Sequence, residues 1–210
     1  VLHGPRGAAT LFSGPSLPSP DPDRMSRDDL RRRMRRRRRA LAAATPEAGA
    51  EAARRLPDDA LPPIRVFAAY LPTGGEFDPG PLAQRLLALG AEQVLPRVPQ
   101  EGSMQFVLAP PDCALEPDAA GQPAPPPGAP ERRPDLVIAP LLAFDRFGGR
   151  LGQGGGHYDQ ALAKLRRTGP VFVLGLAFAG QEVDRLDLEA HDQPLDAVLT
   201  EAGYRRLPQA

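Results

Sequence analysis

The chain has little of several residue types, and each scarcity excludes a class of protein. It has one cysteine, Cys113, and no tryptophan among 210 residues. A single cysteine excludes a disulfide framework and a zinc site built on several thiolates, and it favours a reducing compartment. No apolar run approaches the ~20 residues that span a bilayer. We therefore expect a cytoplasmic protein without a membrane partner.

Hydrophobic residues, by contrast, are present at an ordinary 41%. This fraction excludes wholesale disorder, and the chain is long enough to bury a sizeable core in one domain. Residues 1–24 differ from the rest, because they are rich in Gly, Pro and Ser and show no helical or strand period. They also lack the apolar core of a secretory signal. We expect a disordered leader or an over-extended start there, followed by a single domain over residues 25–210.

Lysine is scarce as well, and charge is unevenly distributed. Lys164 is the only lysine, so the other 25 basic residues are arginine. Ten arginines between Arg24 and Leu41 face only two aspartates, a balance of +8, while the whole chain has a formal net charge of zero. Such a basic arm could attract RNA or DNA by counterion release. The arm lacks interleaved aromatic residues and the rest of the chain is acidic, so nucleic acid is not the partner that we expect.

Hydrophobic periodicity and turn residues predict alternating strands and helices. Ser26 is a candidate N-cap for the first helix and Thr45 for the second. The expected helices cover residues 27–39, 45–56, 79–89 and 158–167, and the expected strands cover 64–71, 93–98, 104–108, 136–139, 171–176 and 197–200. This alternation predicts an α/β fold, a single three-layer α/β/α domain with a largely parallel sheet. Residues 109–134 contain nine prolines and predict an exposed, extended loop.

The most informative segment is residues 144–159, in which six glycines fall within nine positions. Glycine adopts positive φ and leaves no Cβ between backbone amides and a ligand, so successive N–H groups can converge on a phosphate at the start of a helix. The segment predicts a phosphate cradle with Arg150 as a charged clamp and Asp159 as a magnesium ligand. The alternatives are a tight strand-to-helix turn and, for Asp159, a first-turn acid that stabilises its helix.

Two familiar phosphate motifs do not fit this segment. No Gly-Lys-Ser/Thr closes it, which excludes a Walker A loop, and His157 stands where a dinucleotide fingerprint needs its third glycine. A nucleotide-dependent enzyme of other chemistry, such as a dehydrogenase, is therefore disfavoured.

The string Gly-Arg-Leu-Gly-x-Gly-Gly-Gly-His-Tyr-Asp, which starts at Gly149, resembles the 5-formyltetrahydrofolate cyclo-ligase (methenyltetrahydrofolate synthetase) family. Residues 140–145 resemble that family's lead-in, although Leu141 stands where glycine is usual. The likeness continues through Tyr70-Leu71-Pro72 with Glu76 upstream, and through Gln181, His191-Asp192 and residues 195–201 downstream. It covers nearly the whole chain.

The resemblance implies an activity. Members of this family catalyse the ATP-dependent cyclisation of 5-formyltetrahydrofolate to 5,10-methenyltetrahydrofolate, with release of ADP and phosphate. The implied partners are therefore 5-formyltetrahydrofolate and ATP, with Mg²⁺ as cofactor, and we expect a monomer. A family member with lost or altered activity is a further alternative, because Leu141 and Arg27 depart from the usual residues.

The resemblance also implies roles for particular residues. The implied catalytic residues are Arg150 and Tyr158, although Tyr158 could instead only pack beside the loop. The implied ATP-binding residues are Arg27, Arg31, Arg150, Leu151, Gly152, Gln153, Gly154, Gly155, Gly156, His157 and Tyr158. The implied substrate-binding residues are Leu71, Glu76, Gln153, Gly154, Gly155, Gly156 and His157, and the implied metal ligands are Asp159 and Asp192.

Blander interpretations stay open for several of these residues. Glu76 is otherwise an exposed loop acid, His157 a spacer, and Asp192 part of a polar turn. Arg27 stands where the family usually has lysine, and the two differ where geometry matters. Most of the arginines between 32 and 39 are expected to be solvated or to face the body of the domain.

Overall fold

The computed structural model describes residues 25–208, so the prediction for residues 1–24 lies outside the described residues. Along the chain the elements are α1 (Arg27–Ala44), α2 (Ala48–Arg55), β1 (Val66–Ala68), α3 (Gly80–Ala88), β2 (Glu92–Arg97), β3 (Gln105–Leu108), β4 (Glu116–Pro117), β5 (Pro123–Ala124), β6 (Leu136–Ala139), β7 (Ala143–Phe144), β8 (Arg150–Leu151), α4 (His157–Thr168), β9 (Phe172–Leu176), the 3-10 helix η1 (Ala179–Gln181), β10 (Ala197–Thr200) and β11 (Gly203–Arg206). None of the helices within this range has both the length and the apolar character needed to cross a membrane.

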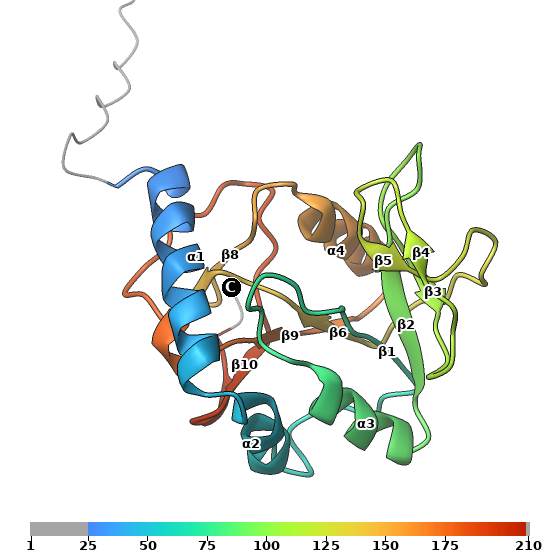
Figure 1. The fold of residues 1–210 in the computed structure, drawn as a ribbon, viewed down its shortest axis with the longest axis horizontal. Coiled ribbons are helices and arrows are strands. Elements are labelled where there is room, and N and C mark those ends of the chain that lie inside the picture. Colours follow the sequence, from blue (N-terminus) through green and yellow to red (C-terminus); the bar gives the residue numbers. More distant parts are fainter. Residues whose placement is uncertain (1–24, 209–210) are drawn as a thin grey trace, which may run out of the picture.

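A seven-stranded sheet forms the centre of the described chain, in the order β11-β10-β9-β6-β1-β2-β3. The five inner strands run parallel, while β3 and β11 pair antiparallel at the two edges. Helices α2 and α3 lie below the sheet in Figure 1, and α4 lies on the other side. The predicted three-layer α/β/α fold with a largely parallel sheet is confirmed.

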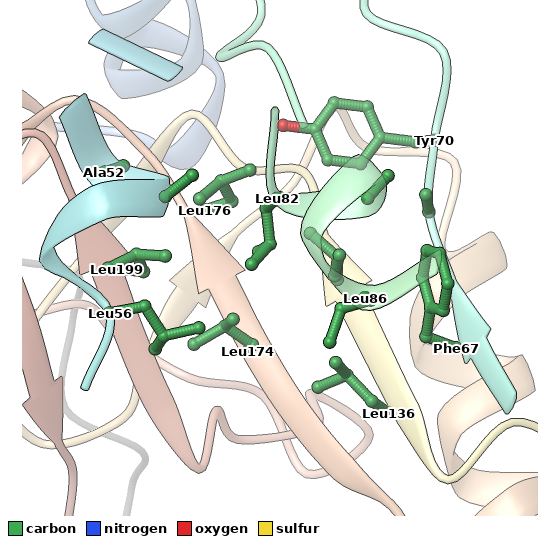
Figure 2. Close-up of a cluster of buried hydrophobic side chains, with 14 of the residues drawn as sticks. Ala52, Leu56, Phe67, Tyr70, Leu82, Leu86, Leu136, Leu174, Leu176 and Leu199 are labelled. Atoms are coloured by element: carbon green, nitrogen blue, oxygen red, sulfur yellow. The ribbon is translucent and has the colours of Figure 1, made fainter. Parts of the chain in front are cut away.

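Period-two alternation in the inner strands builds a core on each face of the sheet. In β6, Leu136 and Ile138 point to the side of α2 and α3, while Val137 and Ala139 point to the side of α4. All four of these residues are fully buried. Figure 2 shows side chains from α2 and α3 meeting those of the strands on the first of these faces. Because both faces are covered, the strand reads as a continuous apolar run.

The sheet has a switch point between β1 and β6. From β1 the chain adds β2 on one side, whereas β6, β9 and β10 extend the sheet on the other. The loops that leave the carboxyl ends of these two neighbouring parallel strands diverge, and ligands in open α/β sheets bind in the crevice between such loops. The topology alone therefore locates the place where a site is expected.

Helix α1 lies across the end of the domain beside β8 (Figure 1). Its N-cap is Ser26, as predicted, with the Ser26 side chain accepting a hydrogen bond from the Asp29 amide at 3.1 Å. Met34 is its buried apolar contact, packed in a small cluster with Leu142 and Leu151. The helix is thus anchored to the β7–β8 hairpin through Met34, while Leu41 and Ala42 near its end pack against the core of the main sheet.

Several details of the predicted elements were wrong. Thr45 does not start α2; it ends α1, and its hydroxyl donates to the Leu41 carbonyl at 2.7 Å. The strand expected over residues 64–71 is paired only over β1. Within the proline-rich residues 109–134, β4 and β5 form a short hairpin in which Ala124 is fully buried.

Candidate active site

A cavity of about 550 Å³ opens at the switch point of the sheet. Its volume lies within the range of about 300–1,000 Å³ that is typical of small-molecule sites. Its walls come from α1, from the segments that follow β1 and β6, from the start of α4, and from the turns near residues 120 and 190. Segments far apart in the sequence therefore build one site.

The glycine run divides into two structural parts. Gly148 and Gly149 belong to the turn of the β7–β8 hairpin, in which the Asp145 amide donates to the Gly149 carbonyl at 3.1 Å. Asp145 is 1% exposed, and its carboxylate accepts hydrogen bonds from the amides of Phe147, Gly149 and Leu186 at 2.8–2.9 Å. Strand β6 therefore does not lead directly into the phosphate loop, because a hairpin that presents Arg150 lies between them.

Residues 152–156 form the part of the run that borders the cavity. Gly156 is the N-cap of α4 with φ +67°, and Gly154 has φ +109°, both in a region that side chains rarely tolerate. The first backbone amides of α4 have no partner within their own helix, so they are available to donate to an anion, which the helix dipole would also favour. This geometry fits the predicted phosphate cradle.

Two arginines of α1 hold this loop by its carbonyl groups. The Arg31 Nε donates to the Gly152 carbonyl at 3.3 Å. Arg35 donates from Nε to the Gln153 side-chain oxygen at 2.9 Å and from Nη2 to the Gln153 carbonyl at 3.1 Å. Because the carbonyls are turned toward α1, the loop is docked against this helix on one side.

Each acid that was predicted to bind metal is paired with an arginine of the site. Asp159 Oδ1 lies 2.6 Å from Arg150 Nη2 and also accepts from the Gln193 amide at 3.0 Å. Asp192 Oδ2 lies 2.8 Å from Arg27 Nη1. The hydrogen bond that Arg27 donates to Asp192 raises the pKa of Arg27. Burial alone would raise the pKa of Asp192, but hydrogen bonds from Arg27 and the Glu189 amide outweigh it and lower that pKa.

Unsatisfied polar atoms mark the cavity. Within residues 25–208, the buried side-chain nitrogen and oxygen atoms without a hydrogen-bond partner are Nε of Arg27, Arg38 and Arg150 and the hydroxyl of Tyr158. All four residues line the cavity. Buried polar groups in folded proteins are nearly always paired, so these four unpaired groups set the wall of the cavity apart from the rest of the described interior.

Tyr158 is held as a neutral phenol. Burial raises its pKa, the charge of Glu76 adds to this effect, and Arg150 opposes it. The Arg150 guanidinium lies 5.9 Å from the centre of the Tyr158 ring. Its hydroxyl is therefore available as a hydrogen-bond donor in the cavity and not as a base.

A second region of the cavity is apolar with a few polar groups. Its walls include Tyr70, Leu71 and Met104, with Glu76 as the acid. The β4–β5 turn, through residues 118–123, adds a further wall. The proline-rich segment is thus part of the site and not only a connection.

The structure brings nearly all of the predicted site residues together. Those that line the cavity are Arg27, Arg31, Leu71, Glu76, Arg150, Gly152, Gln153, Gly154, Gly155, Gly156, His157, Tyr158, Asp159 and Asp192. Leu151 does not line it, because its side chain is 2% exposed and packs in the cluster with Met34. Leu141 is buried over Gly175, where a Cβ would lie 3.0 Å from a Leu141 methyl carbon. The bulk of Leu141 is thus accommodated by the absence of a side chain on β9.

Sequence reasoning missed Arg38, which is 3% exposed and lines the cavity. The signal was present, because Arg27, Arg31, Met34 and Arg38 follow the spacing of one helical face. The surrounding arginines concealed this pattern.

Comparisons with known proteins show which family the chain belongs to. The family model described as "5-formyltetrahydrofolate cyclo-ligase family" matches residues 23–201. The 5-formyltetrahydrofolate cyclo-ligase of Escherichia coli (strain K12) is 35% identical over 169 residues, which cover 73% of this chain and 88% of the relative. That of Mycolicibacterium smegmatis is 31% identical over 183 residues, covering 83% and 93%. The NMR structure of the Aquifex aeolicus 5,10-methenyltetrahydrofolate synthetase superposes with a TM-score of 0.71 at 28% identity, covering 89% of this chain and 95% of the other.

Proposed function

The chain belongs to the 5-formyltetrahydrofolate cyclo-ligase family, and we propose that the cavity at the switch point is where it converts 5-formyltetrahydrofolate to 5,10-methenyltetrahydrofolate at the expense of ATP. The observation that carries this proposal is that the side chains of Arg27, Arg31 and Arg150 and the glycine loop line one cavity. Both substrates are anionic and rich in hydrogen-bond acceptors, as this group of donors requires.

The formyl oxygen is a poor leaving group, so it must be activated before the ring can close. The formyl oxygen takes the γ-phosphoryl group of ATP, which leaves ADP. The neighbouring nitrogen then attacks the activated carbon and releases its proton to water, the five-membered ring closes, and inorganic phosphate departs with the former formyl oxygen. Because phosphoryl transfer involves little covalent chemistry for the protein, catalysis rests on positioning and on charge neutralisation.

The glycine loop and its arginines serve the phosphates in this proposal. The amides at the start of α4 donate to phosphate oxygens, while Arg27, Arg31 and Arg150 neutralise their charge. Arg150 is buried and already oriented by Asp159, so its guanidinium needs little reorganisation when the nucleotide arrives.

Two carboxylates of the site fit a magnesium ion. Among residues 25–208 there is no cluster of three or more His, Cys, Asp or Glu side chains able to form a complete metal cage. Mg²⁺ in nucleotide sites is usually held by one or two carboxylates together with phosphates and water, which is the set that Asp159, Asp192 and ATP would supply. When bound there, the ion would neutralise charge on the transferred phosphoryl group.

The apolar region is assigned to the folate ring system. Leu71 and the neighbouring Tyr70 offer apolar surface, and the Glu76 carboxylate accepts hydrogen bonds from ring or formamide N–H groups. Residues 153–157 lie between the two regions, so they contact both substrates. We assign the neutral Tyr158 hydroxyl as a hydrogen-bond donor to the negative charge that develops on oxygen in the transition state.

The activity is tested with purified protein by following the absorbance of the methenyl product. We expect product only when 5-formyltetrahydrofolate, ATP and a divalent cation are all present, and we expect a chelator to stop the reaction. Turnover without ATP would contradict the proposal. A cytoplasmic location and a monomeric state are further parts of the proposal, tested by fractionation of cells and by sedimentation.

A further inference from the structure

Arg38 differs from its neighbours in α1, because it is buried whereas Arg36, Arg37 and Arg39 are exposed. Its Nη1 lies 3.1 Å from Oε1 of Glu76, whose side chain is only 10% exposed. Removing two charges from water is costly, and their attraction often does no more than offset this cost. Stability alone therefore gives little reason for an ion pair at this position, on the wall of the cavity.

The turn that carries Glu76 is built to lie against α1. Gly74 and Gly75 have φ +57° and +78°, and the Glu76 amide closes the turn on the Thr73 carbonyl at 3.0 Å. A Cβ on Gly75 would lie 3.3 Å from the Arg39 Cα, so the turn and the helix backbone are in close contact. The turn can thus be fixed in place by a side chain of α1.

Arg38 and the turn together hold the Glu76 carboxylate at both oxygens. Oε1 faces Arg38, and Oε2 accepts a hydrogen bond from the Thr73 amide at 3.1 Å. Nη2 of Arg38 adds a long contact of 3.4 Å to the Gly74 carbonyl. A carboxylate held in this way has one orientation, and the lone pairs that remain are available to a ligand.

From this geometry we infer that Arg38 is a positioning residue for the folate: it fixes the direction in which the Glu76 carboxylate faces the cavity. The inference rests on the proposed function, because it takes Glu76 as a contact of the substrate's N–H groups. The groups that face Glu76 are Arg38 from α1, Tyr70 from the segment after β1, and Tyr158 from α4. Arg38 is the cation among them that pairs with it.

Without Arg38, the Glu76 carboxylate would be left buried beside two neutral phenols. A carboxylate that has lost this partner can turn away from the direction that the substrate's N–H groups require, and an opposite charge no longer compensates its burial. The penalty falls on folate binding, whereas the nucleotide loop is held by other arginines, Arg31 and Arg35.

The test compares steady-state kinetics of Arg38→Met with those of the unaltered enzyme. We expect the KM for 5-formyltetrahydrofolate to rise at least tenfold and the KM for ATP to stay within twofold. Arg38→Lys keeps the charge and should recover part of the loss. Arg36→Met, at an exposed position of the same helix, is the matched control and should leave both constants unchanged.

A double-mutant cycle tests whether Arg38 acts through Glu76. If it does, Arg38→Met combined with Glu76→Gln should have a folate KM no more than twofold above that of Glu76→Gln alone. Effects that multiply, or an ATP KM that rises as much as the folate KM, would overturn the inference. If Arg38→Met does not fold, Arg38→Lys and Arg38→Gln are measured in its place, and each is expected to raise the folate KM several-fold. A folate KM equal to that of the unaltered enzyme in both variants would refute the inference. If the unaltered enzyme itself forms no methenyl product, the proposed function fails first.

Discussion

Replacing Asp145 with alanine tests whether one carboxylate holds the hairpin that presents Arg150. Asp145 accepts three backbone hydrogen bonds, from Phe147 and Gly149 within its own turn and from Leu186 in a distant segment. The bonds from Gly149 and Leu186 are buried. Alanine removes the acceptors of all three hydrogen bonds at once.

The expected magnitude follows from the two buried amides. A buried donor left without an acceptor costs about 1–3 kcal/mol, so the two together should lower the free energy of unfolding by about 2–6 kcal/mol. The Phe147 amide is partly exposed and can bond to water instead. The loss is a large fraction of the 5–15 kcal/mol that typically stabilises a domain.

Urea unfolding monitored by circular dichroism measures this loss, provided that the slope with denaturant is unchanged. Asp184→Ala is the matched control, since Asp184 is exposed and lies two residues from Leu186; it should change stability by less than about 0.5 kcal/mol. The KM for ATP of the folded fraction should also rise, because the hairpin carries Arg150. A loss below about 1 kcal/mol for Asp145→Ala would show that the amides find other partners.

Three further predictions concern the nucleotide region. Arg150→Met should raise the KM for ATP at least tenfold and the folate KM much less, because it removes the guanidinium that Asp159 orients; steady-state kinetics decide, and an unchanged ATP KM would exclude Arg150 from the phosphate site. Gly154→Ala forces a side chain onto φ +109° and should lower kcat/KM for ATP at least tenfold, whereas Gly102→Ala, at φ +96° in open space, should cost similar stability without loss of activity. Without Mg²⁺, Asp192→Asn should be less stable than the unaltered protein above about pH 5, because the pKa of Asp192 in the folded protein is lower than the ordinary aspartate pKa of about 4. The difference in stability should vanish as the pH falls through this lowered pKa. Thermal unfolding from pH 3 to 8 measures it, and a difference that does not change with pH would show that the pairing contributes nothing.

The local pattern of apolar residues was sufficient to predict the central strands and the helices that cover them. The central strands have apolar side chains on both faces and the helices have one apolar face, so composition over a few residues reveals both. The antiparallel edge strand β11 was missed because Gly203–Arg206 has no apolar alternation and is a strand only through its pairing with β10. Strand β1 is shorter than predicted, since the chain from Tyr70 onward turns away to line the cavity.

The predicted site depended on short-range signals in the same way. The glycine loop could be identified because the glycines that its backbone conformation requires lie close together in the sequence. The role of Asp145 as a buried acceptor could not, because one of its donors, Leu186, is 41 residues away. Arg38 lies among six other arginines between positions 32 and 39, and its partner Glu76, which distinguishes it from them, comes 38 residues later.

The pairing of Arg27 with Asp192 joins positions 165 residues apart, near the two ends of the described chain. Helix α1 leaves the ribosome before the other described elements, yet the loop that Arg31 and Arg35 hold and the acid that Arg27 meets are synthesised only later. During synthesis, therefore, these three arginines lack these partners until the chain has emerged as far as residues 152–153 and 192. The site that we propose for ATP is thus complete only after most of the chain has been synthesised, and a nascent chain would be unable to bind nucleotide there any earlier.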